Sequence, residues 1–200
     1  MKSGEKIVKF ISYEERLLNG LLLPNMRKVE TLRLKFGLYL VLDGIKKGIL
    51  VYGIALLLGN FKETMIVHTS FLIIRQVSFG WHSLSNIGCI LWSILSFPII
   101  TYIFKQMQFN SFLLFSISSI CCIFIWLSGP IGTQVNTISN IKHKQLLHRK
   151  LKKRILLITL LYFIFPPTIS HYIVLGIMIQ TVTLLIQYVK NGVSSNVREN

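Results

Sequence analysis

Residues 74–89, with the sequence IRQVSFGWHSLSNIGC, form a short polar interruption between two long apolar runs. The stretch contains an Arg, a His and one of only three cysteines in the chain. Polar and ionisable side chains are costly at membrane depth, so a membrane-embedded chain rarely keeps them there without a use. The stretch therefore separates two apolar segments and also marks the first candidate for a functional site.

The apolar runs around this stretch indicate a membrane protein. Of the 200 residues, 52% are hydrophobic, and the mean hydropathy is +0.59. Apolar runs of about 18 residues recur along the chain, which is close to the length that crosses the hydrocarbon core. We therefore expect an all-α, polytopic membrane protein, with residues 1–200 forming a single membrane-embedded domain.

The apolar runs predict about six transmembrane helices. The expected spans are residues 45–61, 65–77, 87–104, 109–127, 155–168 and 172–189. Pro98 lies inside the third span, where a membrane helix tolerates proline and can kink. A long polar loop is expected over residues 128–153. The last two spans are expected to form a hairpin that turns around Pro166-Pro167 and Ser170-His171.

The N-terminal 44 residues are expected to lie at the membrane surface. Over residues 1–34, charged and apolar side chains alternate at helical spacing, which predicts an amphipathic helix that ends near Gly20 or Pro24. This helix can lie on the anionic inner leaflet or pack on the protein's own bundle, and the sequence favours neither. The bundle itself is assigned to residues 45–189, and residues 190–200 are expected to form a flexible tail.

The net charge of +15 follows the expected membrane topology. If the N-terminus is cytoplasmic, six crossings leave all 22 Lys and Arg except Lys62 and Lys105 on the inner side. No aromatic residues interleave with the charges in a soluble module, so a nucleic-acid partner is not expected. The same topology places the N-terminus, His82 and Cys89 at the cytoplasmic face of the cell membrane.

His82 and Cys89 are the candidate catalytic residues. On an unbroken helix they would lie roughly 10 Å apart along the axis, too far for a hydrogen bond. Gly80, Gly88 and the Ser and Asn residues between them favour a break in the helix. Cys89 would then lie in the first turn of the next helix, where the helix dipole favours the thiolate. We expect Cys89 to be the nucleophile and His82 its base, with Arg75 either holding a substrate carboxylate or fixing the loop.

Other interpretations of these residues remain open. A Cys beside an apolar run commonly packs in the core, and a His near a membrane surface is commonly just interfacial. A small transporter or channel, with Arg75 and His82 lining a pathway, is the main alternative, and a structural scaffold is the next. No cofactor is expected, and the five histidines do not favour a metal site, because they show no closed ligand spacing.

The polar stretch resembles the accessory gene regulator protein B family, which are bacterial membrane cysteine endopeptidases that mature quorum-sensing peptide pheromones. The resemblance rests on the Arg…Gly-x-His…Cys spacing, which is carried here by Arg75, Gly80, His82 and Cys89. It extends to residues 129–138, which are similar to the family's Pro-x-Asp-Thr-x-Asn-Lys-Pro loop.

The chain departs from the family pattern at a few positions. Phe79 stands where the family often has a second Gly, and Ser83 where it has a small Ala. In the loop, Gly132 replaces the usual Asp. The His and Cys of the pattern are both present, so the departures concern the loop and the choice of precursor. The resemblance covers about residues 5–189.

The resemblance implies a peptide substrate. The precursor would carry an amphipathic leader, a ring-closing Cys or Ser, and an acidic C-terminal tail. Cys89 would attack the carbonyl before the tail, and the precursor's own Cys or Ser would then close a thiolactone or lactone. Arg75 and Gly80 would support the catalytic pair or bind substrate. The precursor and the lipid bilayer are the implied partners, together with a second copy of the chain, because members of the family form dimers.

Overall fold

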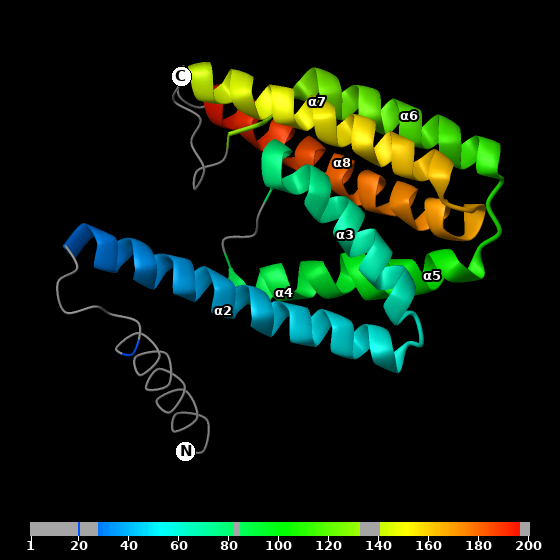
Figure 1. Ribbon diagram of the computed structural model, residues 1–200, viewed down its shortest axis with the longest axis horizontal. Coiled ribbons are helices and arrows are strands. Elements are labelled where there is room, and N and C mark those ends of the chain that lie inside the picture. The colour runs from blue at the N-terminus through cyan, green and yellow to red at the C-terminus, as the bar shows by residue number, and fades with distance from the viewer. Residues whose placement is uncertain (1–19, 21–27, 82–84, 133–140, 197–200) are drawn as a thin grey trace. The chain divides into compact units, whose positions relative to one another are not determined.

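The computed structural model describes residues 20, 28–81, 85–132 and 141–196, and this part of the chain is almost entirely helical (Figure 1). The elements are α2 (Lys28–Leu57), α3 (Phe61–Ser78), α4 (Asn86–Ile94), the π-helix η1 (Leu95–Ile99), α5 (Ile100–Gln106), α6 (Ser111–Ser128), α7 (Ile141–Ile164) and α8 (Pro167–Asn196). The described residues contain no β-strand, so the prediction of an all-α fold is confirmed for them. The predicted amphipathic helix over residues 1–34 falls mostly outside the described residues.

Contacts divide the chain into two compact units, residues 1–49 and residues 50–200. Helix α2 contributes to both units. In the first unit, Asp43 and Lys47 form an ion pair one helical turn apart on α2. The charged residues on both sides of residue 45 therefore lie inside a continuous helix, and no break marks the expected start of the first span there.

Three helical stretches among the described residues are long and apolar enough to cross a membrane. They are Ile87–Gln106, Ser111–Ser128 and Pro167–Asn191. They match the expected spans over residues 87–104, 109–127 and 172–189, and they support a membrane protein. The total of six spans stays a prediction.

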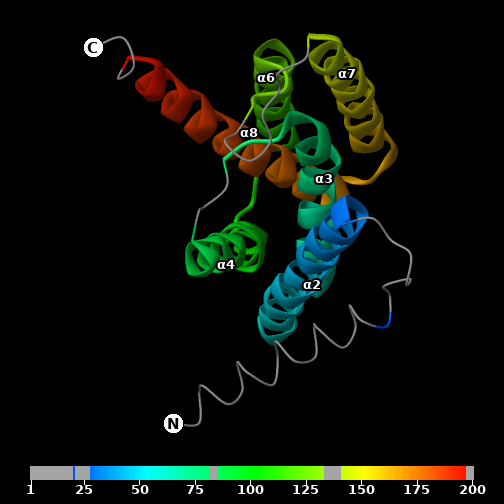
Figure 2. The same ribbon diagram turned by 90° about the vertical axis from the view of Figure 1, so that its left-hand side faces the viewer.

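Helix α8 is the central element of the second unit. It packs against α3, α6 and α7, and Figure 2 shows it running among these three helices. Their shared core consists of aliphatic side chains that are almost fully buried, among them Ile74, Ile125, Leu151, Ile158, Ile177 and Leu184. This packing fixes the C-terminal end of α3 against α8, where the candidate site begins.

The crossing of α3 over α8 depends on a glycine. A Cβ atom built at Gly176 would lie 2.0 Å from Ser70 Oγ and 2.6 Å from the carbonyl oxygen of Val67. Only a residue without a side chain lets the two backbones approach this closely, as is common between membrane helices.

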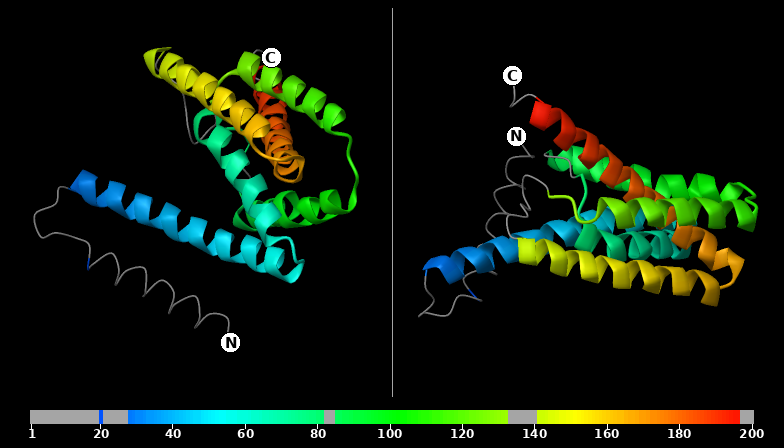
Figure 3. Two further views of the ribbon diagram at one scale, coloured as in Figure 1. Left: turned by 45° about the vertical axis from the view of Figure 1, so that its right-hand side comes forward. Right: turned by 90° about the horizontal axis from the view of Figure 1, so that it is seen from above.

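Helices α4, η1 and α5 follow one another without a break from Asn86 to Gln106, and both views in Figure 3 show them as one rod. Pro98 lies inside η1, and the helical stretch continues through it. Proline has no N–H to donate, and a π-helical turn accommodates the missing bond. The carbonyl oxygen of Pro98 accepts a 2.8 Å hydrogen bond from Asn60 Nδ2 at the start of α3.

The prediction of a long polar loop over residues 128–153 is wrong for its second half. Helix α7 begins at Ile141, so the basic residues up to Arg154 lie on a helix. Leu147, Leu151 and Ile155 recur every four residues and are buried, while the cations occupy the other faces. Lys, Arg, Gln and Leu also have good helix propensity, and an apolar stripe at this spacing lets the segment pack as a helix.

The final turn also differs from the prediction. Helix α7 ends at Ile164 and α8 begins at Pro167, so the turn is formed by Phe165 and Pro166 alone. Pro167 occupies the first position of α8, where its fixed φ is favourable and its missing N–H has no consequence. Ser170 and His171, which were expected in the turn, are helical.

Candidate active site

The helix break predicted ahead of Cys89 is confirmed, because α3 ends at Ser78 and α4 begins at Asn86. The chain leaves α3 through Phe79 and Gly80, which both have positive φ angles of 60° and 121°. Positive φ is uncommon for a residue with a side chain and is readily adopted by glycine. His82, the expected base, lies outside the described residues, and so does Ser83.

Gly80 is required at this turn for reasons of space as well as φ. The residue is buried, and a Cβ atom there would lie 3.0 Å from Thr183 Oγ1 and 3.5 Å from Gln180 Nε2. Gly80 is thus a position where the turn packs tightly against α8, and its supporting role in a site stays a prediction.

Two residues of α8 hold the turn in place. Gln180 Nε2 donates to Ser78 Oγ at 2.8 Å and to the carbonyl oxygen of Phe79 at 2.7 Å. The backbone N–H of Trp81 donates to the carbonyl oxygen of Thr183 at 3.0 Å. Losing one of these bonds would leave a buried polar group unsatisfied, at a cost of about 1–3 kcal/mol. Sequence reasoning missed both α8 residues, although polar side chains in a long apolar run were a signal for them.

The segment 129–132 runs beside the same turn. The N–H of Ile131 donates to the carbonyl oxygen of Ser78 at 3.2 Å, and Ile131 forms an isolated parallel bridge with Phe79. At the end of the segment, Asn191 Nδ2 donates to the carbonyl oxygen of Gly132 at 3.2 Å. The start of the loop that carries the second part of the family resemblance is therefore packed against the turn, and the rest of that loop, residues 133–140, is outside the described residues.

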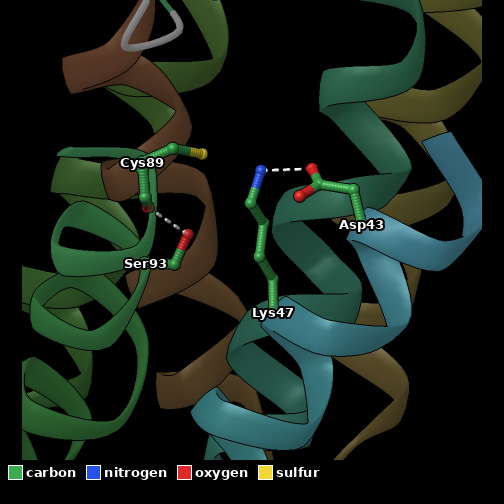
Figure 4. Close-up of polar contacts among 4 residues, drawn as sticks. All are labelled: Asp43, Lys47, Cys89 and Ser93. Carbon is green, nitrogen blue, oxygen red and sulfur yellow. Dashed lines mark hydrogen bonds and ion pairs between the residues drawn. The ribbon is translucent and has the colours of Figure 1, made fainter. Parts of the chain in front are cut away.

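Cys89 lies in the first turn of α4, as the sequence predicts. Ser85 is the N-cap residue: its side chain accepts from the N–H of Gly88 at 3.5 Å, and its carbonyl oxygen accepts from the N–H of Cys89 at 2.9 Å. Figure 4 shows the Cys89 side chain on α4 and the 2.9 Å bond from Ser93 Oγ to the Cys89 carbonyl oxygen. The thiol is partly buried and forms no disulfide. The positive end of a helix stabilises a thiolate at this position.

Arg75 is near both the turn and Cys89. Its Nη2 donates to the carbonyl oxygen of Trp81 at 3.1 Å, and its Cζ lies 5.2 Å from the centre of the Phe71 ring. The guanidinium also interacts electrostatically with the Cys89 thiol. The arrangement brings together two of the residues singled out in the sequence, and it fits the expectation that Arg75 fixes the loop. An edge-to-face contact between Trp81 and Trp92, with ring centres 5.4 Å apart, further ties the turn to α4.

A second arginine binds the C-terminal end of α3. Arg154 Nη1, from α7, donates to the carbonyl oxygen of Ile73 at 2.6 Å and to Gln76 Oε1 at 2.9 Å. A cation at this end of a helix complements the helix dipole. Within the described part of the chain, no group of three or more His, Cys, Asp or Glu side chains could hold a metal ion.

Comparison with known proteins shows to which family the chain belongs. A sequence model of the family described as Accessory gene regulator B matches residues 5–184. The chain belongs to this family. The resemblance read from the sequence is therefore confirmed, and accessory gene regulator B proteins act in accessory gene regulation and quorum sensing.

Relatives in the accessory gene regulator B family span nearly the same length as this chain. The chain is 29% identical over 161 residues to accessory gene regulator protein B of Staphylococcus intermedius, covering 80% of this chain and 85% of the relative. It is 26% identical over 186 residues to the protein of the same name in Staphylococcus haemolyticus, covering 90% and 92%. An AgrB-like protein of Listeria monocytogenes is 29% identical over 154 residues, 76% of each chain. No solved structure matches the chain.

Proposed function

We propose that the chain is a membrane cysteine endopeptidase that removes the C-terminal tail of a small pheromone precursor. The observation that carries the proposal is the setting of Cys89, in the first turn of α4 and directly after a turn that Arg75 binds through the Trp81 carbonyl oxygen. A helix N-terminus and a neighbouring cation both favour the thiolate, which is the nucleophilic form of cysteine. We assign His82 as the base of a His82–Cys89 dyad, because it precedes the helix on the same short connection.

The reaction that follows from this pair has two steps. His82 takes the proton of Cys89, and the thiolate attacks the carbonyl carbon before the tail. His82 then returns the proton to the leaving nitrogen, which frees the tail and leaves an acyl-thioester on Cys89. N–H groups at the start of α4 are candidates to stabilise the oxyanion.

The second step closes the ring of the pheromone. The precursor's own Cys attacks the acyl-thioester and releases Cys89 as a thiol, giving a thiolactone; a Ser at the same position gives a lactone. Because one thioester replaces another when Cys closes the ring, this step needs no ATP.

The proposal includes a membrane topology and two protein partners. Six crossings put the N-terminus and the site on the cytoplasmic side of the cell membrane, where most Lys and Arg residues of the chain would lie. The amphipathic N-terminal segment would lie on the membrane beside the leader of the precursor. The acidic tail of the precursor would be drawn to these cations, and a second copy of the chain would complete a homodimer.

Intact mass spectrometry of the purified protein with a synthetic precursor tests the peptidase. We expect the wild type to gain the mass of the precursor without its tail and to release the tail, and Cys89→Ala to do neither. Cys121→Ala is the matched control, since Cys121 is a second, partly buried thiol on α6 and should be dispensable. If Cys89→Ala still released the tail, Cys89 would not be the nucleophile. If a matched precursor gave neither adduct nor tail with the wild type, the transporter or scaffold interpretation would be favoured.

A further inference from the structure

The polar side chains of α8 that hold the turn before His82 have no role in the reaction proposed above. Gln180 and Thr183 lie in a candidate membrane span, and both side chains are completely buried. Buried polar groups at this depth are costly unless they are fully hydrogen-bonded, so their presence requires an explanation.

The Gln180 amide donates both of its N–H hydrogens to the turn. Its two Nε2 donors bind Ser78 Oγ at 2.8 Å and the carbonyl oxygen of Phe79 at 2.7 Å. Thr183 Oγ1 lies 3.1 Å from Gln180 Oε1 and 2.9 Å from the Gln180 carbonyl oxygen, so its one hydrogen is shared between these two acceptors. Hydrogen bonds of this kind in a low-dielectric interior restrict the geometry of the groups that form them.

The hydrogen-bond network continues to the peptide group between Trp81 and His82. The N–H of Trp81 donates to the Thr183 carbonyl oxygen at 3.0 Å, on the far side of Gly80 from the Gln180 contacts. The Trp81 carbonyl oxygen belongs to the peptide group that leads into His82, and it accepts from Arg75 Nη2 at 3.1 Å. Contacts from α8 and α3 therefore fix the backbone on both sides of Gly80, up to the residue before His82.

We propose that Gln180 is a positioning residue for the His82–Cys89 pair: it holds in one conformation the turn at residues 78–81, from which the chain leads into His82. This inference rests on the proposed function. The hydrogen bonds of Gln180 go to Ser78, Phe79 and Thr183, so we expect it to affect the catalytic rate through the turn and not through precursor binding.

The pH dependence of Cys89 alkylation measures the effect without any precursor. The experiment uses the full-length protein with Cys121→Ala and Cys122→Ala, so that iodoacetamide reports on Cys89 alone. Arg75 interacts electrostatically with this thiol. His82→Ala is therefore measured in the same background, so that a shift shared by His82→Ala and the Gln180 variant identifies the part due to His82.

We expect Gln180→Met to move the alkylation midpoint to higher pH, in the same direction as His82→Ala. At neutral pH, alkylation should slow by up to about tenfold, which is the effect of raising the midpoint by about one pH unit. Thr183→Val should produce a smaller shift in the same direction. Thr181→Val is the matched control, because Thr181 Oγ1 bonds the carbonyl oxygen of Ile177 in its own helix, and it should leave the profile unchanged. For tail release, Gln180→Met should lower kcat and leave KM unchanged.

The outcomes separate this inference from the proposed function. If His82→Ala has the wild-type alkylation profile, the dyad itself is absent and both proposals fail. If His82→Ala shifts the profile and Gln180→Met does not, the dyad stands and the role of Gln180 is overturned. Should Gln180→Met fail to accumulate in membranes, Thr183→Val decides, and a profile equal to that of Thr181→Val overturns the inference.

Discussion

At the scale of single residues, Gly80 is the position in the turn where a side chain is least tolerated. Its φ of 121° is unfavourable for any residue with a side chain, and a Cβ atom would lie 3.0 Å from Thr183 Oγ1. Backbone strain of this kind costs on the order of 1–3 kcal/mol, and the contact with Thr183 adds to it. An alanine at this position can be accommodated only if the turn moves away from α8.

We therefore expect Gly80→Ala to reduce tail release at least about tenfold, since a rearrangement costing about 1.4 kcal/mol already has that effect. Gly59→Ala is the matched control: Gly59 also has a positive φ of 66°, but a Cβ there would meet nothing within 4 Å. Rates of tail release and thermal unfolding of the two detergent-solubilised variants measure the difference. Equal rates for both variants would show that contact with α8 is irrelevant to catalysis.

The residues of this turn differ in how far the sequence could predict them. The helix break at Gly80 and the position of Cys89 in the first turn of α4 follow from local preferences of Gly, Ser and Asn, so they were predictable. Gln180 is 102 positions from its partner Ser78, and no local rule pairs them. Pattern reasoning marks Gln180 only as a polar residue in an apolar helix, and the packing of α3 on α8 decides what it binds.

At the scale of helices, the contact between α3 and α8 determines whether Gln180 can reach the turn. Gly176 lies one helical turn before Gln180 on the same face of α8, at the closest approach to α3. A side chain at Gly176 would meet the backbone of α3 as well as Ser70, and backbone atoms cannot rotate away. Any substitution here must move one helix against the other.

We expect Gly176→Ala to destabilise the protein by at least about 1–3 kcal/mol, the usual cost of overpacking, and to reduce tail release. Gly53→Ala is the control, because Gly53 is also helical and a Cβ there meets nothing within 4 Å. Alanine should be neutral or favourable at that position, since it has the better helix propensity. Thermal unfolding in detergent compares the variants, and an unfolding temperature of Gly176→Ala equal to the wild type would contradict the close crossing.

Helix α7 shows why the sequence predicted some helices better than others. The spans that hydropathy indicates most strongly, such as residues 111–128, were predicted to within a few residues. The first half of α7 is too rich in Lys and Arg to be read as a membrane span, and its apolar residues recur only once per turn. Its helical state became evident from Leu147, Leu151 and Ile155, which are buried in a core that only the folded chain forms.

At the scale of the whole molecule, part of the excess positive charge is exposed on helix α7. The exposed cations of this helix are Lys142, Lys144, Arg149, Lys150, Lys152 and Lys153. They are fixed on one rigid element instead of being spread over a loop, so their field is concentrated along α7. Such a surface raises the encounter rate of an acidic partner, and salt weakens the effect.

If α7 attracts the acidic tail, kcat/KM for tail release should fall several-fold as ionic strength rises from about 50 to about 500 mM, because the screening length shortens well below 10 Å. Lys150→Gln combined with Lys153→Gln should lower kcat/KM at low salt and flatten this dependence, since both cations are exposed on α7. Lys62→Gln, which removes an exposed cation from the side predicted to face outward, is the matched control and should leave the dependence unchanged. A precursor with an uncharged tail should be processed equally at both salt concentrations. If Lys62→Gln flattened the salt dependence as much as the α7 pair does, the attraction would come from net charge alone, and α7 would have no special part in it.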